Sequence, residues 1–122
     1  MSCPFCEINT DKIIMENSLC FAVYDLYPVN KGHILIITKR HAEDYFQASA
    51  KEKAAIFSLL EDCRGFLEKK YSPDGFNIGL NCGRAAGQTI MHLHLHLMPR
   101  YKGDIDNPKG GVRGVIPDKR IY

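Results

Sequence analysis

The most regular pattern in this chain is an alternation of histidine and apolar residues over positions 92–98, which read HLHLHLM. In a β-strand, successive side chains point to opposite faces of the sheet. The pattern therefore predicts a strand whose leucines face a core and whose histidines, His92, His94 and His96, share the opposite face. Neighbouring histidines on that face would lie ~6.6–6.8 Å apart along the strand.

Other apolar patterns predict the remaining elements. Three short runs rich in β-branched and aromatic residues are typical of strands: residues 20–25, 33–38 and 76–81. Residues 49–70 carry an apolar stripe at helical spacing from Ile56 to Leu67, and Ser49 with Glu52 predicts a capping box at the helix start. The expected fold class is α+β: an antiparallel sheet of about five strands with one long helix and a short one.

Composition and charge narrow the class of protein. The 122 residues suit a single domain over 1–122, in which the Gly/Pro-rich residues 99–122 form an irregular tail. A net charge of +2 gives no support for a nucleic-acid or membrane partner, and no apolar run reaches the ~20 residues of a membrane span. The N-terminus does not resemble a signal peptide. Five cysteines, of which only Cys3 and Cys6 are close in sequence, favour a reducing cytoplasm over a disulfide framework.

The row of histidines has three interpretations. It can be a polar sheet face that happens to use histidine. It can hold a metal ion, because alternate histidines on a strand can chelate one ion and imidazole is a common zinc ligand. It can perform covalent catalysis, in which one neutral imidazole attacks phosphorus while its neighbours bind the phosphate oxygens.

A family resemblance bears on this choice. Residues 87–100, GQTIMHLHLHLMPR, resemble the signature of the histidine-triad (HIT) family. Val23-Tyr24-Asp25 followed by Pro28, then Gly32-His33 and Lys39-Arg40-His41, resemble the family's earlier motifs in the same order. The resemblance covers nearly the whole chain and implies a single histidine-triad domain. The Pro-Arg end and the later GGVRGVIP look more like the dinucleoside-polyphosphate hydrolases of the family than the phosphoramidases.

The resemblance assigns roles to particular residues. It implies that His94 is the nucleophile on an α-phosphate, giving a nucleotidyl-histidine intermediate that water then hydrolyses. His96 and Gln88 would contact the phosphate and the scissile oxygen, and His33 would join the same cluster. The implied nucleotide-binding residues are Asp25 on the ribose hydroxyls, Asn81 and Thr89 near the phosphate, and Ile14, Met15, Val23 and Leu26 around the base. A strand would hold the nucleophile rigidly, and a backbone carbonyl would fix its tautomer.

The spacing Cys3-Pro-Phe-Cys6 suggests a second site. In some family members a similar pair binds zinc together with two histidines, which are His41 and His92 in this chain. The implied Cys₂His₂ set is a closed, structural type of site. A free thiol pair, or a role for His41 near the N-cap of a short helix, is the alternative.

The leading expectation is a nucleotide hydrolase or nucleotidyl transferase that uses a purine nucleotide, with dinucleoside polyphosphates such as diadenosine tetraphosphate as first substrates. An adenosine phosphoramidate hydrolase and a non-catalytic nucleotide sensor are the alternatives. A metalloenzyme that uses all three strand histidines on one ion is a third. The resemblance also implies a homodimer, and Lys109 and Arg113 are expected to bind distal phosphates.

Overall fold

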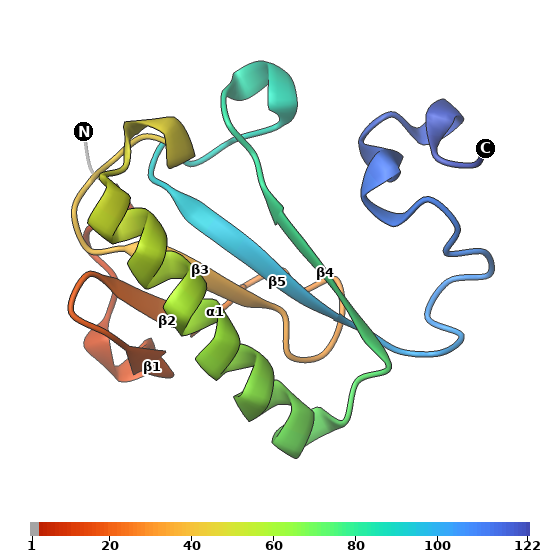
Figure 1. Ribbon diagram of the computed structural model, residues 1–122, viewed down its shortest axis with the longest axis horizontal. Coiled ribbons are helices and arrows are strands. Elements are labelled where there is room, and N and C mark those ends of the chain that lie inside the picture. The colour runs from red at the N-terminus through yellow and green to blue at the C-terminus, as the bar shows by residue number, and fades with distance from the viewer. Residues whose placement is uncertain (1–2) are drawn as a thin grey trace.

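A computed structural model describes residues 3–122. Five antiparallel strands form one sheet in the order β1-β2-β3-β5-β4, and a single long helix, α1, crosses one face (Figure 1). The elements are β1 Met15–Glu16, β2 Cys20–Tyr24, β3 Ile34–Thr38, α1 Ala50–Tyr71, β4 Gly75–Leu80 and β5 His94–Arg100. This is the α+β class expected from the sequence. No helix of the described chain is long and apolar enough to cross a membrane.

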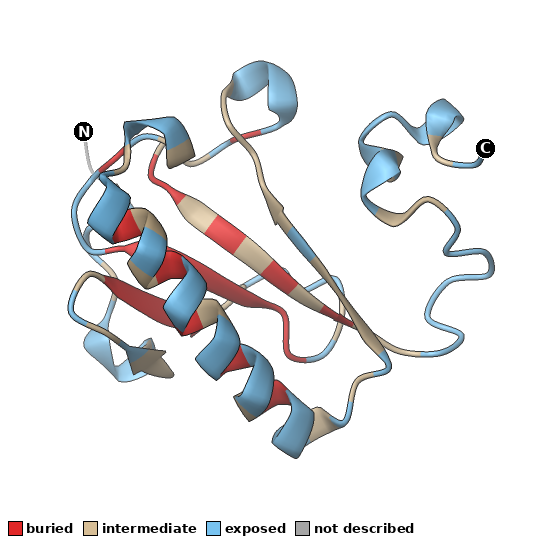
Figure 2. Ribbon diagram, in the orientation of Figure 1, coloured by how far each residue is buried: buried red, intermediate tan, exposed pale blue. Residues whose placement is uncertain are grey.

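The main core lies between α1 and the sheet. Ile56, Leu59 and Leu67 of the helix are buried against Leu95 and Leu97 of β5. The buried positions form a band along the helix where it faces the sheet (Figure 2). The leucines of the alternating segment therefore face the helix, as predicted, and the histidine side chains are left for the opposite face.

The opposite face of the sheet carries a second, smaller apolar cluster. Phe21, Val23, Leu35 and Ile37 of β2 and β3 are buried there, together with Phe5 from the N-terminal segment. In the β3–β5 register, Ile37 pairs with His94 and Leu35 pairs with His96. The catalytic candidates thus stand on a largely apolar surface, which lowers the local dielectric around them.

Local sequence signals place both ends of α1. The Ser49 side chain accepts a hydrogen bond from the Glu52 N–H at 3.1 Å, and the Glu52 carboxylate accepts one from the Ser49 N–H at 2.9 Å, so the predicted capping box is present. The helix ends at Ser72, which adopts the left-handed conformation. The expected short helix is a single 3₁₀ turn, Tyr45–Gln47, whose N-cap is Asp44 rather than His41.

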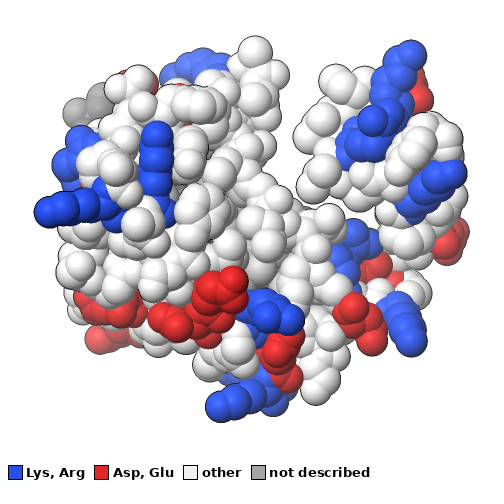
Figure 3. All heavy atoms as spheres, in the orientation of Figure 1, with Lys and Arg blue, Asp and Glu red and all other residues white. Residues whose placement is uncertain are grey.

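Residues 101–122 form a tail without strands, which lies beyond β4 and projects from the body (Figures 1 and 3). Asp104 anchors its start, because it accepts two hydrogen bonds from the Arg100 guanidinium and one from the Asn30 side chain, each 2.7–2.8 Å long. Further along, Lys109 and Arg113 both pack over the Tyr122 ring. These two side chains are therefore held within the tail, apart from the histidines.

Candidate active site and metal cluster

The ring of His94 is held in one tautomer by the backbone of its own strand. Its Nδ1 lies 2.8 Å from the His92 carbonyl oxygen. A carbonyl can only accept, so Nδ1 carries the proton and donates it to that oxygen. Nε2 is then left with an unprotonated lone pair. The ring is half-buried and packs against Phe5, with ring centroids 5.0 Å apart.

A chain of hydrogen bonds fixes the tautomers of two further histidines. The Val29 N–H donates to His33 Nδ1 at 3.1 Å, so the neutral His33 ring carries its proton on Nε2. That Nε2 lies 3.0 Å from His96 Nδ1 and donates to it. His96 Nδ1 is therefore an acceptor, and its remaining nitrogen, Nε2, carries a proton. The relay turns His96 into a neutral donor beside the ring of His94.

Burial keeps these donors uncharged. Burial is the largest cause that lowers the pKa of His96, to about 4, with smaller effects of His94 and His33 in the same direction and an opposing effect of Asp25. Burial also lowers the pKa of His33, against the attraction of Asp25. At neutral pH, His33 and His96 therefore present neutral N–H groups as hydrogen-bond donors.

Asp25 lies between the histidines and an apolar hollow. Its Oδ1 accepts from the Tyr27 N–H at 2.9 Å, and its Oδ2 lies 3.4 Å from His33 Nε2 and 3.9 Å from His96 Nδ1. The carboxylate also lines the hollow beside Val23. It is therefore placed to accept hydrogen bonds from a diol that bridges the two regions.

The apolar hollow encloses about 290 Å³. Its wall is formed by Val23 and Leu26, as the sequence predicted, but also by Phe5, Ile8 and Ile90. Its size and mostly apolar lining suit a flat heterocycle, and the polar side chains of Asn9 and Lys12 also line it.

The structure corrects two of the residues expected around the base. Ile14 and Met15 pack against the helix-side core, not into this hollow. For Met15 the reason is the register of β1, in which Met15 pairs with Ala22, a residue of the helix-side cluster. Side chains directly opposite each other on antiparallel strands share a face, so Met15 points away from the histidines.

The structure also gives Gln88 a different role from the expected contact with substrate. Its side chain is buried, and its Oε1 accepts from the Gly83 N–H at 2.8 Å. Its Nε2 donates to the carbonyl oxygens of Glu43 at 2.6 Å and Ile90 at 3.0 Å. Both ends of the amide are therefore occupied by backbone groups, and Gln88 fastens the loop before β5.

The other two polar residues expected at the phosphate differ in position. Thr89 is exposed and lines a hollow of about 520 Å³ beside Cys3, His41 and Arg84. Asn81 is half-buried directly after β4. Thr89 therefore faces the border of the metal-ligand cluster, and Asn81 begins the loop that Gln88 fastens.

The structure brings Cys3, Cys6, His41 and His92 together. Cys3 Sγ lies 3.3 Å and Cys6 Sγ 3.4 Å from His92 Nδ1, and Cys6 Sγ lies 3.3 Å from His41 Nδ1. The two Nδ1 atoms are 3.1 Å apart. Tetrahedral zinc, with bonds of about 2.3 Å to sulfur and 2.0–2.1 Å to nitrogen, implies separations of roughly 3.3–3.8 Å. The three S···N separations fall in this range and the N···N separation is slightly shorter, so the four donor atoms surround a site of about the size that such an ion requires.

The tautomer of His92 agrees with a ligand role. Its Nε2 lies 2.7 Å from the Thr38 carbonyl oxygen and donates to it, so Nδ1 is unprotonated and faces the two thiols. Metal-bound histidines commonly donate their other ring N–H to a carbonyl in this way. Because Thr38 is the last residue of β3, the cluster is fixed to the end of the middle strand of the sheet.

The three-histidine metal site is not supported by the described residues. The groups with ligand spacing are the Cys₂His₂ cluster and the set of Asp25, His33 and His96. His94 belongs to neither set, and His92 and His96 fall in different sets, so the three strand histidines do not converge on one ion. In the second set His33 Nε2 carries a proton, since Nδ1 accepts from Val29, so that nitrogen has no lone pair for an ion.

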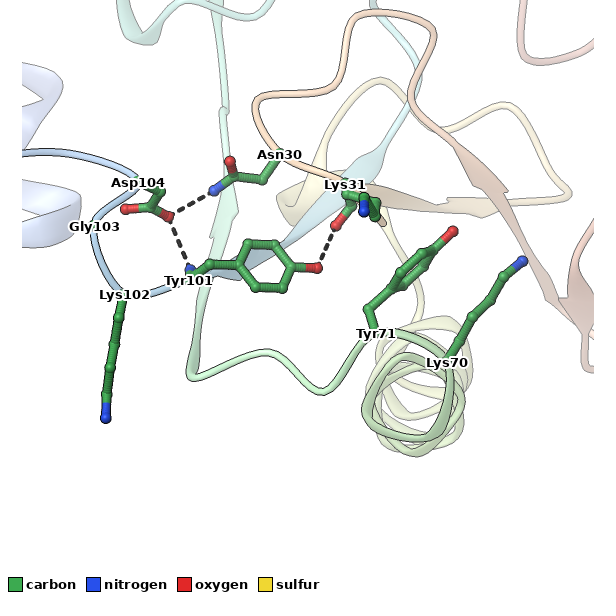
Figure 4. Close-up of a pocket in the computed structure, with 8 residues that line it drawn as sticks. All are labelled: Asn30, Lys31, Lys70, Tyr71, Tyr101, Lys102, Gly103 and Asp104. Atoms are coloured by element: carbon green, nitrogen blue, oxygen red, sulfur yellow. Dashed lines mark hydrogen bonds between the residues drawn. The ribbon is translucent and has the colours of Figure 1, made fainter.

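A more open hollow, of about 570 Å³, lies at the far end of α1 (Figure 4). Lys31, Lys70 and Lys102 surround it, and its Asp104 carboxylate is bound by Asn30. The Tyr101 hydroxyl donates to the Lys31 carbonyl at 2.7 Å. The polar contacts here anchor the start of the tail, and no histidine lines this hollow.

Two contributors to the site were missed by the sequence analysis. Phe5 was noted only as a spacer between two cysteines, and no apolar period marks a single buried ring in an irregular segment. The Val29 N–H, which sets the tautomer of His33, is a backbone group and leaves no trace in the residue type.

Comparison with known proteins agrees with this arrangement. The HIT domain family matches residues 7–103. An AP-4-A phosphorylase of Mycobacterium tuberculosis is 32% identical over 107 residues, which cover 83% of this chain and 55% of the relative. An adenosine 5'-monophosphoramidase of Schizosaccharomyces pombe is 35% identical over 104 residues, covering 82% of this chain and 75% of the relative.

Solved structures show the same fold. A HIT family protein from Bacillus anthracis has a TM-score of 0.79 and 36% identity, covering 84% of this chain and 76% of that one. A Zn-bound histidine triad family protein from Mycobacterium smegmatis has a TM-score of 0.78 and 33% identity, covering 85% of this chain and 78% of that one. The fold, the histidine cluster and these matches agree, and the chain belongs to the histidine-triad (HIT) family.

Proposed function

We propose that this protein is a nucleotide hydrolase or nucleotidyl transferase that attacks an α-phosphate with His94. The observation that carries the proposal is the 2.8 Å contact between His94 Nδ1 and the His92 carbonyl. It leaves Nε2 unprotonated and aimed by a rigid strand, which is what a nucleophilic imidazole requires.

The proposed binding mode uses the three regions of the site in sequence. The base enters the apolar hollow between Val23 and Phe5. The ribose hydroxyls bind the Asp25 carboxylate, which lies at the border of that hollow. The α-phosphate then lies over His94, where the Nε2–H of His96 donates to a phosphate oxygen.

The reaction is a double displacement. The lone pair of His94 Nε2 forms a P–N bond, and the bond from phosphorus to the leaving group breaks with its electron pair on the leaving group. Water then attacks phosphorus and releases a proton to solvent, and the P–N bond breaks to return the lone pair to Nε2. The neutral donor His96 stabilises the charge that develops on the phosphate oxygens in both steps.

Dinucleoside polyphosphates are the proposed substrate class, with diadenosine tetraphosphate as the first test. The relative named AP-4-A phosphorylase supports this choice. The low pKa values of His33 and His96 support it as well, because these two rings supply no acid at neutral pH. A polyphosphate leaves as a stable anion, whereas an amine must gain a proton. The relative named adenosine 5'-monophosphoramidase keeps phosphoramidates as the second candidate.

We further propose that Cys3, Cys6, His41 and His92 hold a structural Zn²⁺ ion. Four protein ligands would close the coordination sphere, so the ion would supply stability and no activated water. All five cysteines are free, which supports a reducing cytoplasm as the compartment. The unpaired edge of β4, where Ile78 is exposed, supports the homodimer that the family resemblance implies.

The test is hydrolysis of diadenosine tetraphosphate and of an AMP phosphoramidate by wild type and by His94→Ala. We expect turnover of at least one substrate by the wild type, at least ~10³-fold lower in the variant, and a wild-type protein adenylylated on histidine after rapid acid quench. AMP binding retained by His94→Ala is the control for folding. Binding without turnover by wild type would instead indicate a nucleotide sensor.

A further inference from the structure

The segment that covers the histidine face is only loosely joined to the sheet by its backbone. In the described chain, the backbone hydrogen bonds of residues 3–13 are local, such as those from the Cys6 and Glu7 N–H groups to the Cys3 carbonyl. The first bond to a strand is from the Ile14 N–H to the Ala22 carbonyl, at 2.8 Å. Side chains must therefore hold this segment in place.

Ile8 and Ile13 pack against the apolar cluster on this face, and two adjacent attachments hold the start of the segment. One is the metal-ligand cluster, in which Cys3 and Cys6 meet His92. The other is the Phe5 ring between the two cysteines, which is buried and meets two histidines edge-on. Its centroid is 5.9 Å from that of His92 and 5.0 Å from that of His94.

The same ring is part of the nucleotide pocket of the proposed function. Pro4, Phe5 and Ile8 of the N-terminal segment line the 290 Å³ hollow together with Val23 of β2. One aromatic side chain thus touches a metal ligand, the proposed nucleophile and the base pocket.

We propose that Phe5 is a positioning residue that couples metal occupancy of the Cys₂His₂ cluster to nucleotide binding. The inference rests on the proposed function for the nucleotide pocket. When the four donors bind an ion, residues 3–6 are fixed and Phe5 is pressed against His94 and the pocket. When the ion is removed, the thiols keep only weak S–H contacts to imidazole nitrogen, and the pocket wall gains freedom.

The coupling must be reciprocal. If bound metal raises the affinity for a nucleoside monophosphate by some factor, the nucleotide raises the affinity for the metal by the same factor. Couplings between two sites in one protein commonly fall between about 5-fold and 150-fold. For a single ring that links the two sites, we expect about 10-fold in each direction.

The experiment measures both affinities on the full chain. Zn²⁺ affinity is measured by competition with a chromophoric chelator, with and without saturating AMP. AMP affinity is measured by calorimetry on zinc-loaded and chelator-stripped protein whose fold is checked by circular dichroism. We expect AMP to tighten Zn²⁺ binding about 10-fold, and removal of zinc to weaken AMP binding by the same factor.

Two variants distinguish the effect of Phe5 from that of the other residues that line the hollow. Phe5→Leu keeps all four ligands, so it binds Zn²⁺, but AMP no longer changes its Zn²⁺ affinity. Ile8→Ala alters the same hollow at a residue outside the Cys3–Cys6 segment, so it weakens AMP binding in both metal states and retains the coupling. The Zn²⁺ competition needs no stripped protein, so it decides the matter even where stripping unfolds the chain.

The outcomes are distinguishable. AMP that binds zinc-loaded wild type without changing its Zn²⁺ affinity would overturn the coupling and leave the proposed function intact. Full coupling in Phe5→Leu would overturn the role of this ring. Failure of zinc-loaded wild type to bind AMP would contradict the proposed function and the coupling together.

Discussion

His33 Nε2 and His96 Nδ1 lie 3.0 Å apart, and this contact determines which nitrogen of His96 carries the proton. His33 is itself oriented by the Val29 N–H, at 3.1 Å. The Val29 backbone amide thus sets the tautomer of His96, the neutral donor beside the proposed nucleophile His94, through two successive hydrogen bonds. Both hydrogen bonds are made by uncharged imidazole rings.

Replacing His33 by alanine should lower kcat more than it raises KM. Without the donor on His33, His96 is free to move its proton to Nδ1 and to lose the donor at Nε2. We expect kcat to fall about 10-fold to 100-fold, the range for partners that orient a functional histidine, with KM changed less than about threefold. Steady-state kinetics on diadenosine tetraphosphate provide the measurement.

A purely structural effect of His33→Ala would leave the tautomer of His96 unchanged. Nitrogen NMR of the His96 ring, which reports the tautomer, therefore completes the test. The proton on Nε2 in wild type should redistribute in His33→Ala. Lys102→Ala, in the hollow at the far end of α1, serves as the matched control with unchanged kinetics. An unchanged kcat in His33→Ala would contradict the relay.

The free energy of unfolding should depend on pH through His96. Its folded pKa, about 4, lies below the ordinary 6.5, so the unfolded chain binds the proton first as pH falls. Stability is therefore fully present above pH 6.5 and declines between pH 6.5 and 4, by on the order of 3 kcal/mol from this group. Urea unfolding at pH 7, 5.5 and 4.5 measures the decline. His96→Gln should show a shallower one; parallel curves for both proteins would rule out this origin.

The elements with strong periodicity were predictable, and those that depend on register or on a single contact were not. HLHLHLM has a period of two over seven residues, so its two faces follow from strand geometry alone. Met15 lies in a strand of two residues, too short for a period, and only its pairing with Ala22 reveals its face. The strand itself begins at His94, since the Leu93 N–H donates to the Ala42 carbonyl, which lies beyond the end of β3.

The Cys₂His₂ cluster shows a different limit. The resemblance implied the four ligands, and the structure brings them together, but the sequence holds no sign that the Thr38 carbonyl orients His92 or that Phe5 lies on its ring. Such contacts depend on the tertiary arrangement of segments that are far apart in the chain.

Removing both thiols should affect stability more than the chemical step. Cys3→Ala with Cys6→Ala leaves His41 and His92 without the other half of a tetrahedral set, so the N-terminal segment loses its main attachment. We expect the melting temperature to fall by ~5 °C or more, while kcat per folded molecule stays within about threefold at a temperature where both proteins are folded. Thermal melts followed by circular dichroism, with zinc content from elemental analysis, provide the measurement.

Cys82→Ala is the matched control for that variant, because Cys82 lies outside the cluster and is only half-buried. It should melt with wild type and retain its zinc. A double variant that melts with wild type and yet has lost kcat would show that the cysteines belong to the chemistry, and the structural assignment of the metal would then be wrong.

Substituting Gln88 distinguishes a loop fastener from a substrate contact. Gln88→Ala leaves the Gly83 N–H and the carbonyls of Glu43 and Ile90 without their partner, and a buried unsatisfied group costs about 1–3 kcal/mol. We expect the free energy of unfolding in urea to fall by ~2 kcal/mol or more. Gln88→Glu keeps an acceptor for Gly83 but turns a carboxylate toward two carbonyls, so at neutral pH it should be at least as unstable as the alanine variant. Acidification should recover part of that loss, because the introduced carboxyl group, once protonated, donates to one carbonyl. If both variants were as stable as wild type but inactive, Gln88 would be a substrate contact and not a residue that fastens the loop.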